Sequence, residues 1–317
     1  MIWWILSAVA VMAVGGVVFM LIYTLPIARR VYKEQLVRTT PDKWGRVCSA
    51  PDNEEQQAMW DAGCAWAEEN KDKMQEVETE NEGLHLYGEL YRNPDSKRCA
   101  IILPGRCECL KYSYYFAPPY MQAGMNVLVI DTRAHGRSDG THNTIGRKES
   151  GDVIAWMRLL IEQYGMEEIY LHTICIGSAA GLAALTRPDC PAEAKGIITE
   201  GCFVSFRETF KEHMIADKRP LFPVLDLVML QIKKHCGTNV YTFKPMKLVK
   251  KLGGRALFLF GEQDIFSRPP KSRKLFAACS APDKQIEWFA KGGHSHLRIN
   301  NTEQYDAAVV KFVGYEK

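Results

Sequence analysis

Residues 168–185 read EIYLHTICIGSAAGLAAL, and this stretch decides the fold. The run 168–172 has the apolar composition of a short buried strand, and 179–185 has the small, apolar composition of a closely packed helix. The residues between them, 173–178, predict a tight turn from strand to helix. Such a turn is typical of a nucleophile elbow, which forces one side chain outward at the end of a strand. Here that side chain belongs to Cys175.

Small residues surround Cys175, as the close passage of a strand and a helix requires. Gly177 and Ser178 fill the later small positions, Thr173 stands where a first Gly is usual, and Cys replaces the usual Ser. A Cys at a helix N-terminus beside a His readily becomes a thiolate, because the helix dipole and an imidazolium both favour the anion. The alternative interpretation is a small buried hydrophobe, since free Cys is among the most buried residue types.

Strand-like and helix-like stretches alternate along most of the chain. Short apolar or alternating runs predict strands over 84–91, 99–103, 126–131, 168–173, 196–200, 255–260 and 285–289. Helical character lies between most of them, at about 112–123, 148–164, 177–187, 270–279 and 302–314. This alternation predicts a mostly parallel central sheet with helices on both faces. A chain of 317 residues with 47% hydrophobic content can bury one such core.

One interval breaks the alternation. From Phe203 to Leu252 about fifty residues separate two strands, too many for a single crossover helix, which predicts an inserted helical lid. Lys and Arg outnumber Asp and Glu in this interval by ten to four. The excess fits either an ordinary solvated face or a surface that lies near an anionic membrane or an acidic substrate.

The N-terminal segment predicts a membrane anchor. No charged side chain occurs from Met1 to Ala28, and Ile2 to Ile22 is almost wholly apolar, which is enough for one transmembrane helix. A cleaved signal peptide is the competing interpretation, but the segment lacks a positive start and a small-residue cleavage site. A cluster of basic residues follows the span, namely Arg29, Arg30, Lys33 and Arg38. By the positive-inside rule, we expect a single-pass protein of the cell membrane with its C-terminal domain in the cytoplasm.

Three parts are predicted along the chain. Residues 1–28 are the anchor, 29–70 a polar linker followed by an amphipathic helix from Asn53, and 71–317 the α/β domain with its lid at about 203–252. The ten cysteines show no disulfide-framework spacing, which fits a reducing compartment. The net charge of +3 is too small to indicate nucleic acid as a partner. The Cys107-Glu108-Cys109 pair has no matching second pair, so no metal site is expected.

A cysteine nucleophile needs a base and a group that orients the base. Asp264 follows the predicted strand 255–260, and His294 follows the last predicted strand in a Gly-Gly-His turn. We therefore expect Asp264 and His294 to act with the cysteine as a catalytic triad. Two alternatives remain: Glu200, which ends the strand before the lid, could replace the acid, and His296 could replace the base.

The oxyanion formed during acyl transfer needs hydrogen-bond donors, each worth roughly 3 kcal/mol in the transition state. The N–H of Ile176, which opens the helix after the nucleophile, is one candidate. The second is expected in the loop after the strand 99–103, which reads Pro104-Gly105-Arg106. Arg106 N–H is the candidate donor there. Its guanidinium could instead bind a substrate carboxylate or cover the surface.

Two further motifs carry a family resemblance. Residues 131–140, DTRAHGRSDG, resemble the D-x-R-x-H-G-x-S-x-G loop of the α/β-hydrolase superfamily, and Pro104-Gly105 is similar to its His-Gly motif with the His lost. The chain order of nucleophile, acid and histidine is also that of the superfamily. Together these motifs span about 84–315, and they resemble bacterial serine aminopeptidase-like and esterase-like α/β-hydrolases. The resemblance implies the α/β-hydrolase fold.

Three positions depart from the superfamily pattern: Thr173, Cys175 and Pro104. Dienelactone hydrolases and polyhydroxyalkanoate synthases are similar in using a Cys at this place, the first to hydrolyse and the second to transfer acyl groups. His135 lies in the loop that is structural in the family, so we assign it no catalytic role.

The predicted function is that of a membrane-anchored hydrolase that cleaves an ester or thioester through an acyl group bound to Cys175. The expected partners are a small-molecule or lipid-like acyl substrate and the membrane, and no cofactor is implied. An acyltransferase, which passes the acyl group to an acceptor other than water, is the first alternative. A binding module without catalytic activity is the second.

Overall fold

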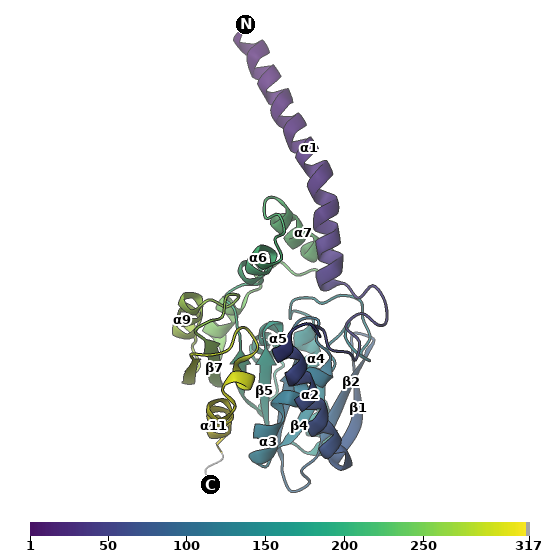
Figure 1. Ribbon diagram of the computed structural model, residues 1–317, viewed down its shortest axis with the longest axis vertical. Coiled ribbons are helices and arrows are strands. Elements are labelled where there is room, and N and C mark those ends of the chain that lie inside the picture. The colour runs from purple at the N-terminus through teal and green to yellow at the C-terminus, as the bar shows by residue number, and fades with distance from the viewer. Residues whose placement is uncertain (315–317) are drawn as a thin grey trace.

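The computed structural model of the chain describes residues 1–314 and is built on one eight-stranded sheet (Figure 1). The strand order is β1-β2-β4-β3-β5-β6-β7-β8, and the strands from β3 to β8 run parallel. Their bounds are β1 Met74–Asn81, β2 Leu84–Tyr91, β3 Arg98–Leu103, β4 Asn126–Ile130, β5 Glu168–Ile174, β6 Ala194–Glu200, β7 Arg255–Gly261 and β8 Asp283–Phe289. All seven strands predicted from the sequence are present.

The edge strand β1 was not predicted. It pairs antiparallel with β2, and only Val77 of its eight residues is buried. Its sequence, MQEVETEN, is polar because both of its faces are largely solvated, so the alternation that marks a half-buried strand is absent.

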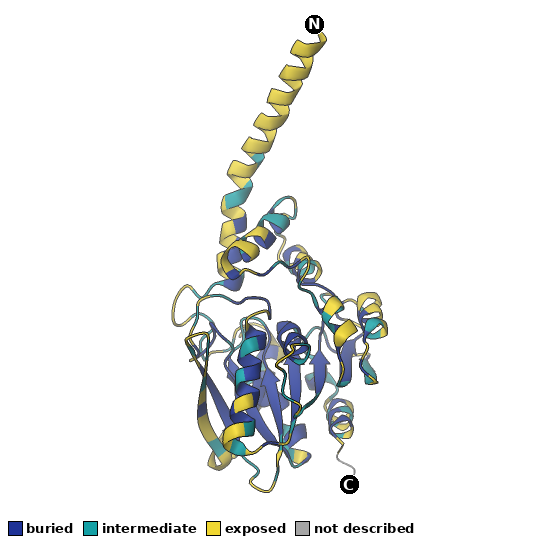
Figure 2. Cartoon of the chain, turned by 180° about the vertical axis from the view of Figure 1, so that it is seen from behind, coloured by how far each residue is buried: buried dark blue, intermediate teal, exposed yellow. Residues whose placement is uncertain are grey.

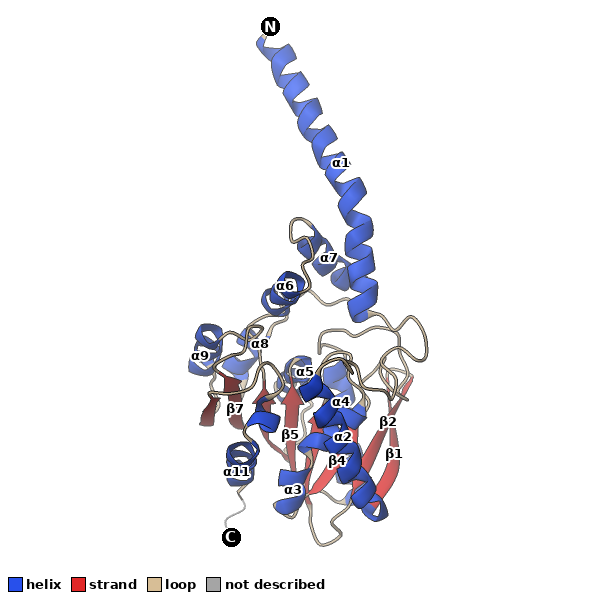
Figure 3. Ribbon diagram, in the orientation of Figure 1, coloured by secondary structure: helices blue, strands red, loops and turns tan. Residues whose placement is uncertain are grey.

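Helices cover both faces of the sheet (Figure 3). One face packs against α4 (Glu149–Tyr164), α5 (Ile176–Leu185) and α9 (Pro269–Ala278). The other face packs against α2, η2, α3 and α11, whose bounds are Glu54–Glu69, Leu110–Phe116, Pro118–Gln122 and Thr302–Phe312. Two short helices complete the domain, η1 at Lys71–Lys73 and α10 at Leu297–Asn300. The prediction of a mostly parallel sheet between two helical layers is confirmed.

The helical insertion predicted between β6 and β7 is also present. It contains α6 (Phe206–Ala216), α7 (Val224–Cys236), α8 (Pro245–Leu248) and η3 (Val249–Lys251). Helices α6 and α7 lie above the carboxyl ends of the parallel strands, and α7 packs against the base of α1 (Figure 1). We call α6, α7 and the loop between them the lid.

Helix α1 spans Ile2–Leu36 and is longer than the sequence predicts. Its residues 2–19 are exposed, whereas Ala28, Val31, Tyr32 and Leu36 are buried against the lid (Figure 2). The prediction that a polar linker begins at residue 29 is therefore wrong for the last turns of the helix. These turns persist because an apolar side chain recurs every three or four residues and packs on α7.

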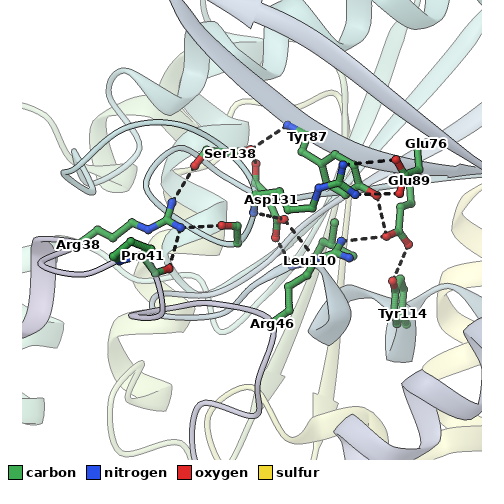
Figure 4. A network of polar contacts seen from close by, with 12 residues as sticks. Arg38, Pro41, Arg46, Glu76, Tyr87, Glu89, Leu110, Tyr114, Asp131 and Ser138 are labelled. Carbon is green, nitrogen blue, oxygen red and sulfur yellow. Dashed lines mark hydrogen bonds and ion pairs between the residues drawn. The ribbon is translucent and has the colours of Figure 1, made fainter.

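The segment after α1 is bound to the domain by polar contacts (Figure 4). The guanidinium of Arg38 donates to the carbonyl oxygens of Gly136 and Ser138, at 2.8 and 2.9 Å. Arg46 forms an ion pair of 2.9 Å with Glu89, a carboxylate of β2. Residues 38–46 thus lie against the sheet and the loop after β4.

Candidate active site

The turn at Cys175 has the strained geometry of an elbow. β5 ends at Ile174, α5 begins at Ile176, and Cys175 between them has a φ of +49°. A non-glycine residue with positive φ is uncommon and persists only where its surroundings impose it. The N–H of Cys175 donates to the carbonyl oxygen of Glu200 at 2.9 Å, which fixes the turn to the end of β6.

Two glycines of α5 make the elbow possible. A Cβ at Gly177 would lie 2.7 Å from the carbonyl oxygen of Leu103, so only Gly lets α5 approach the end of β3. A Cβ at Gly181 would lie 2.7 Å from Cγ2 of Thr173. Thr can therefore replace the usual first Gly of the elbow because the facing residue on the helix is itself Gly.

Asp264 and His294 meet at the carboxyl ends of β7 and β8. Asp264 Oδ2 lies 2.7 Å from His294 Nδ1, and both side chains are almost fully buried. The other carboxylate oxygen, Oδ1, accepts the N–H groups of Phe266 and Ser267 at 2.8 and 2.7 Å. Burial alone would raise the pKa of Asp264, but His294 and these two donors hold it below its usual value. Asp264 is therefore a carboxylate that holds the imidazole in one orientation.

The imidazole of His294 also lies near the elbow. A Cβ on Gly201, which directly follows the residue bonded to Cys175 N–H, would lie 2.8 Å from Cε1 of His294. Burial alone would lower the pKa of His294, but its interactions with Asp264 and then Cys175 raise it well above its ordinary value. The Nε2 atom is buried and has no hydrogen-bond partner within residues 1–314. This nitrogen is free to exchange a proton with a reacting group.

The two alternative residues are engaged elsewhere. Glu200 accepts Leu297 N–H at 3.0 Å and the Tyr305 hydroxyl at 2.6 Å, so both of its oxygens are occupied. The Nε2 atom of His296 lies 2.6 Å from Oε1 of Gln56, a residue of α2. The structure thus brings Asp264, rather than Glu200, to His294.

The predicted oxyanion donors lie on two neighbouring segments. Ile176 is the first residue of α5, so its N–H is one of the helix's unpaired donors. Arg106 lies in the loop between β3 and η2, and no hydrogen bond to another described residue engages its N–H. The contact between Gly177 and the end of β3 brings these two segments together. The Arg106 side chain donates to Gln35 of α1, so the guanidinium does not simply cover the surface.

The lid contributes a residue that the sequence did not indicate. The ring of His213, on α6, stacks on Phe266 with centroids 3.9 Å apart and lies 6.3 Å from the ring of His294. Burial, and then the charge of Arg106, lower the pKa of His213 to about 3, so it is neutral at ordinary pH. The charged residues of α6 indicate a solvated face in sequence, and no local signal marks this position.

The arrangement offers a thiol, an oriented imidazole and two backbone donors, which are the groups that acyl-transfer chemistry uses. Within the described part of the chain, no three His, Cys, Asp or Glu side chains are grouped so as to hold a metal ion. The ten cysteines are free thiols, including Cys107 and Cys109.

Comparison with protein-family models gives no match. Among curated proteins, the chain is 24% identical over 208 residues to the uncharacterized protein YqkD of Bacillus subtilis, covering 64% of this chain and 66% of that protein. It is 26% identical to protein bem46 of Schizosaccharomyces pombe, over 56% of this chain and 54% of that protein. It is 25% identical to the uncharacterized membrane protein YNL320W of Saccharomyces cerevisiae, over 57% of this chain and 59% of that protein. The matches cover less than two thirds of each relative's length.

Solved structures share the fold. An esterase of Pyrococcus furiosus, Pf2001, superposes with a TM-score of 0.65 and 18% identity, covering 78% of this chain and 92% of that one. An alpha-beta hydrolase of Vibrio vulnificus gives a TM-score of 0.63 and 17% identity, covering 90% of this chain and 93% of that one. A monoacylglycerol lipase of Paleococcus ferrophilus gives a TM-score of 0.53 and 19% identity, covering 73% of this chain and 99% of that one. These likenesses confirm the fold class predicted from the sequence.

Proposed function

We propose that this chain, which has the α/β-hydrolase fold, is a hydrolase that cleaves an ester or thioester through an acyl group bound to Cys175. The observation that supports this most strongly is the convergence of a cysteine elbow with the Asp264–His294 pair, in which His294 Nε2 is buried and has no hydrogen-bond partner among residues 1–314. The neighbours named as an esterase and a lipase are consistent with such chemistry.

The proposed reaction has two halves. In the first, His294 Nε2 takes the thiol proton as Cys175 Sγ attacks the acyl carbon, the carbonyl electron pair moves onto oxygen, and the N–H groups of Ile176 and Arg106 hold that oxyanion. When the tetrahedral intermediate collapses, His294 Nε2 gives a proton to the departing alcohol or thiol. In the second half, His294 takes a proton from water, whose oxygen attacks the thioester. The C–S bond then breaks, His294 returns the proton to Cys175 Sγ, and the acid is released. Asp264 keeps Nδ1–H pointing at itself throughout.

Intact mass spectrometry tests the proposal on the full-length chain in lipid nanodiscs. Incubation with S-butyryl and S-palmitoyl N-acetylcysteamine should add one acyl mass to the wild type, on the peptide that contains Cys175. Cys175→Ala should carry no adduct and should lose at least ~10³-fold in hydrolysis of p-nitrophenyl butyrate. Hydrolysis at the wild-type rate by the Ala variant would remove Cys175 from the mechanism.

We further propose that α1 anchors the protein in a membrane, with the catalytic domain on the cytoplasmic side. Among the described residues, α1 is the one helix long and apolar enough to cross a bilayer, and one relative is named a membrane protein. The basic residues that follow Ile22 favour the cytoplasm. Protease added outside intact cells should leave the domain whole, and digestion from outside would reverse the orientation.

A further inference from the structure

The loop that carries Arg106 is held by a carboxylate of its own. It spans residues 104–109, from the end of β3 to the start of η2. Within it, the N–H of Gly105 donates to Glu108 Oε2 at 2.6 Å. Cys107, between the two bonded residues, has a φ of +69°, which marks a tight reversal. Glu108 is partly exposed as a residue, but its carboxylate turns inward across this reversal.

The same carboxylate is contacted from α2. Gln56 Nε2 lies 3.4 Å from Glu108 Oε1, and Gln56 Oε1 lies 2.6 Å from His296 Nε2. His296 is two residues beyond His294, so one side chain of α2 bridges the Arg106 loop and the loop of the proposed base. Gln56 is buried, which gives these contacts a fixed geometry.

A third contact reaches the loop from α1. The Arg106 guanidinium donates to Gln35 Oε1, on the last turn of the helix. That turn is immobilised by its neighbours: Leu36 is fully buried, and its carbonyl oxygen accepts Asn143 N–H at 3.0 Å. The loop is thus held from α1, from α2 and from within.

We propose that Glu108 is a positioning residue that builds the oxyanion hole, with Gln56 and Gln35 holding it and Arg106 in place. The inference rests on the proposed function. By taking up the N–H of Gly105, Glu108 fixes the orientation of the next peptide group. The N–H of that group belongs to Arg106 and has no partner among the described residues. Without that acceptor, the Gly105–Arg106 peptide can rotate, because the rotation changes ψ of Gly105, a residue that has no Cβ to oppose it, together with φ of Arg106. A rotated peptide would present a carbonyl oxygen to the oxyanion instead of a donor.

Glu108→Ala and Glu108→Gln test the inference in the full chain in nanodiscs, with p-nitrophenyl butyrate and S-butyryl N-acetylcysteamine as substrates. Loss of one oxyanion donor costs about 10²–10³ in kcat, so the Ala variant should lose ~10²-fold in kcat with KM changed less than about threefold. The Gln variant should stay within about fivefold of the wild type, because its amide oxygen can still accept Gly105 N–H. Gln56→Ala should lose kcat in the same direction by a smaller factor.

Glu149 supplies the matched control. Its carboxylate also accepts loop N–H groups, from Thr144 at 2.7 Å and Gly146 at 3.0 Å, but in a loop that carries neither proposed donor. Glu149→Gln should therefore have a kcat within about twofold of the wild-type value. Should Glu108→Ala fail to fold, the Gln56 and Glu108→Gln variants still decide the question.

The outcomes separate the two proposals. If the wild type acquires no acyl mass at Cys175, the proposed function fails. If the wild type is acylated, the positioning role is refuted by an Ala or Gln56 variant with wild-type kcat. A Gln variant as slow as the Ala variant, or a loss expressed in KM alone, would refute it equally.

Discussion

Two regions of this chain form the candidate site in opposite ways. The strand ends that carry Cys175, Asp264 and His294 are each marked locally, by an elbow or by a turn after an apolar strand. Residues 29–70 carry no such mark, yet Gln35 and Gln56 of this segment reach the loop that would hold the oxyanion. The difference teaches that reacting groups can be recognised from motifs, whereas the side chains that position them depend on contacts distant in sequence.

The largest effect is expected where the two candidate acids are compared directly. Asp264→Asn keeps the shape of the side chain but removes the charge that holds His294, so kcat should fall by about 10²–10⁴-fold. Glu200→Gln should cost less than about tenfold, since Glu200 is bonded to Leu297 and Tyr305. Hydrolysis of p-nitrophenyl butyrate by the full chain measures both. A larger loss in the Glu200 variant would transfer the orienting role to that residue.

The sheet, the lid and the candidate reacting groups can be predicted from the sequence because their signals are periodic or tied to a turn. Strand β1 cannot, because its eight residues are mostly polar where both of its faces are solvated. The end of the apolar helix was predicted too early, at residue 28, because composition shows where charges begin and not which apolar residues face a lid. The contact of His213 with His294 depends on how α6 lies over the sheet, and no pattern within α6 reveals that placement.

Truncation should divide α1 into an anchor and a part of the site. Residues 2–19 are exposed, whereas the turns from Ala28 to Leu36 pack on the lid and carry Gln35. Deleting 2–23 should give a chain that no longer partitions with membranes and keeps kcat on p-nitrophenyl butyrate within about threefold. Deleting 2–36 should lower kcat by at least ~10-fold. Equal kcat values for the two truncated chains would mean that residues 28–36 connect the anchor to the domain without contributing to the site.

The ten thiols should differ in reactivity toward iodoacetamide. Burial raises the pKa of several thiols, that of Cys109 to about 12 and those of Cys99 and Cys202 further. Cys175 is only partly buried and is the thiol that we propose His294 activates. Peptide mass analysis at pH 7 should show Cys175 labelled at least ~10-fold faster than these three, with activity lost in parallel. Earlier labelling of another cysteine with activity preserved would contradict the triad.

The smallest effect concerns the pH dependence of stability. Burial raises the pKa of Glu108 from 4.5 to about 7. The folded state therefore favours the neutral acid, so the stability from this group is fully present below pH 4.5. It is lost as the pH rises from about 4.5 to 7, by at most about 3 kcal/mol. The charges of His294 and Glu200 act on the same titration, the first lowering and the second raising the pKa of Glu108.

Glu108→Gln removes this titration and retains the neutral acceptor. The unfolding free energy of the variant minus that of the wild type should therefore be larger at pH 8 than at pH 5. Urea unfolding of the full chain in detergent micelles measures this difference. Substitution of Gln for the exposed Glu303 controls for a change of net charge. If the unfolding free energies of the wild type and Glu108→Gln changed in parallel with pH, the Glu108 carboxylate would be solvated in the folded state. In that case its hold on Gly105 would be too weak to set the oxyanion loop.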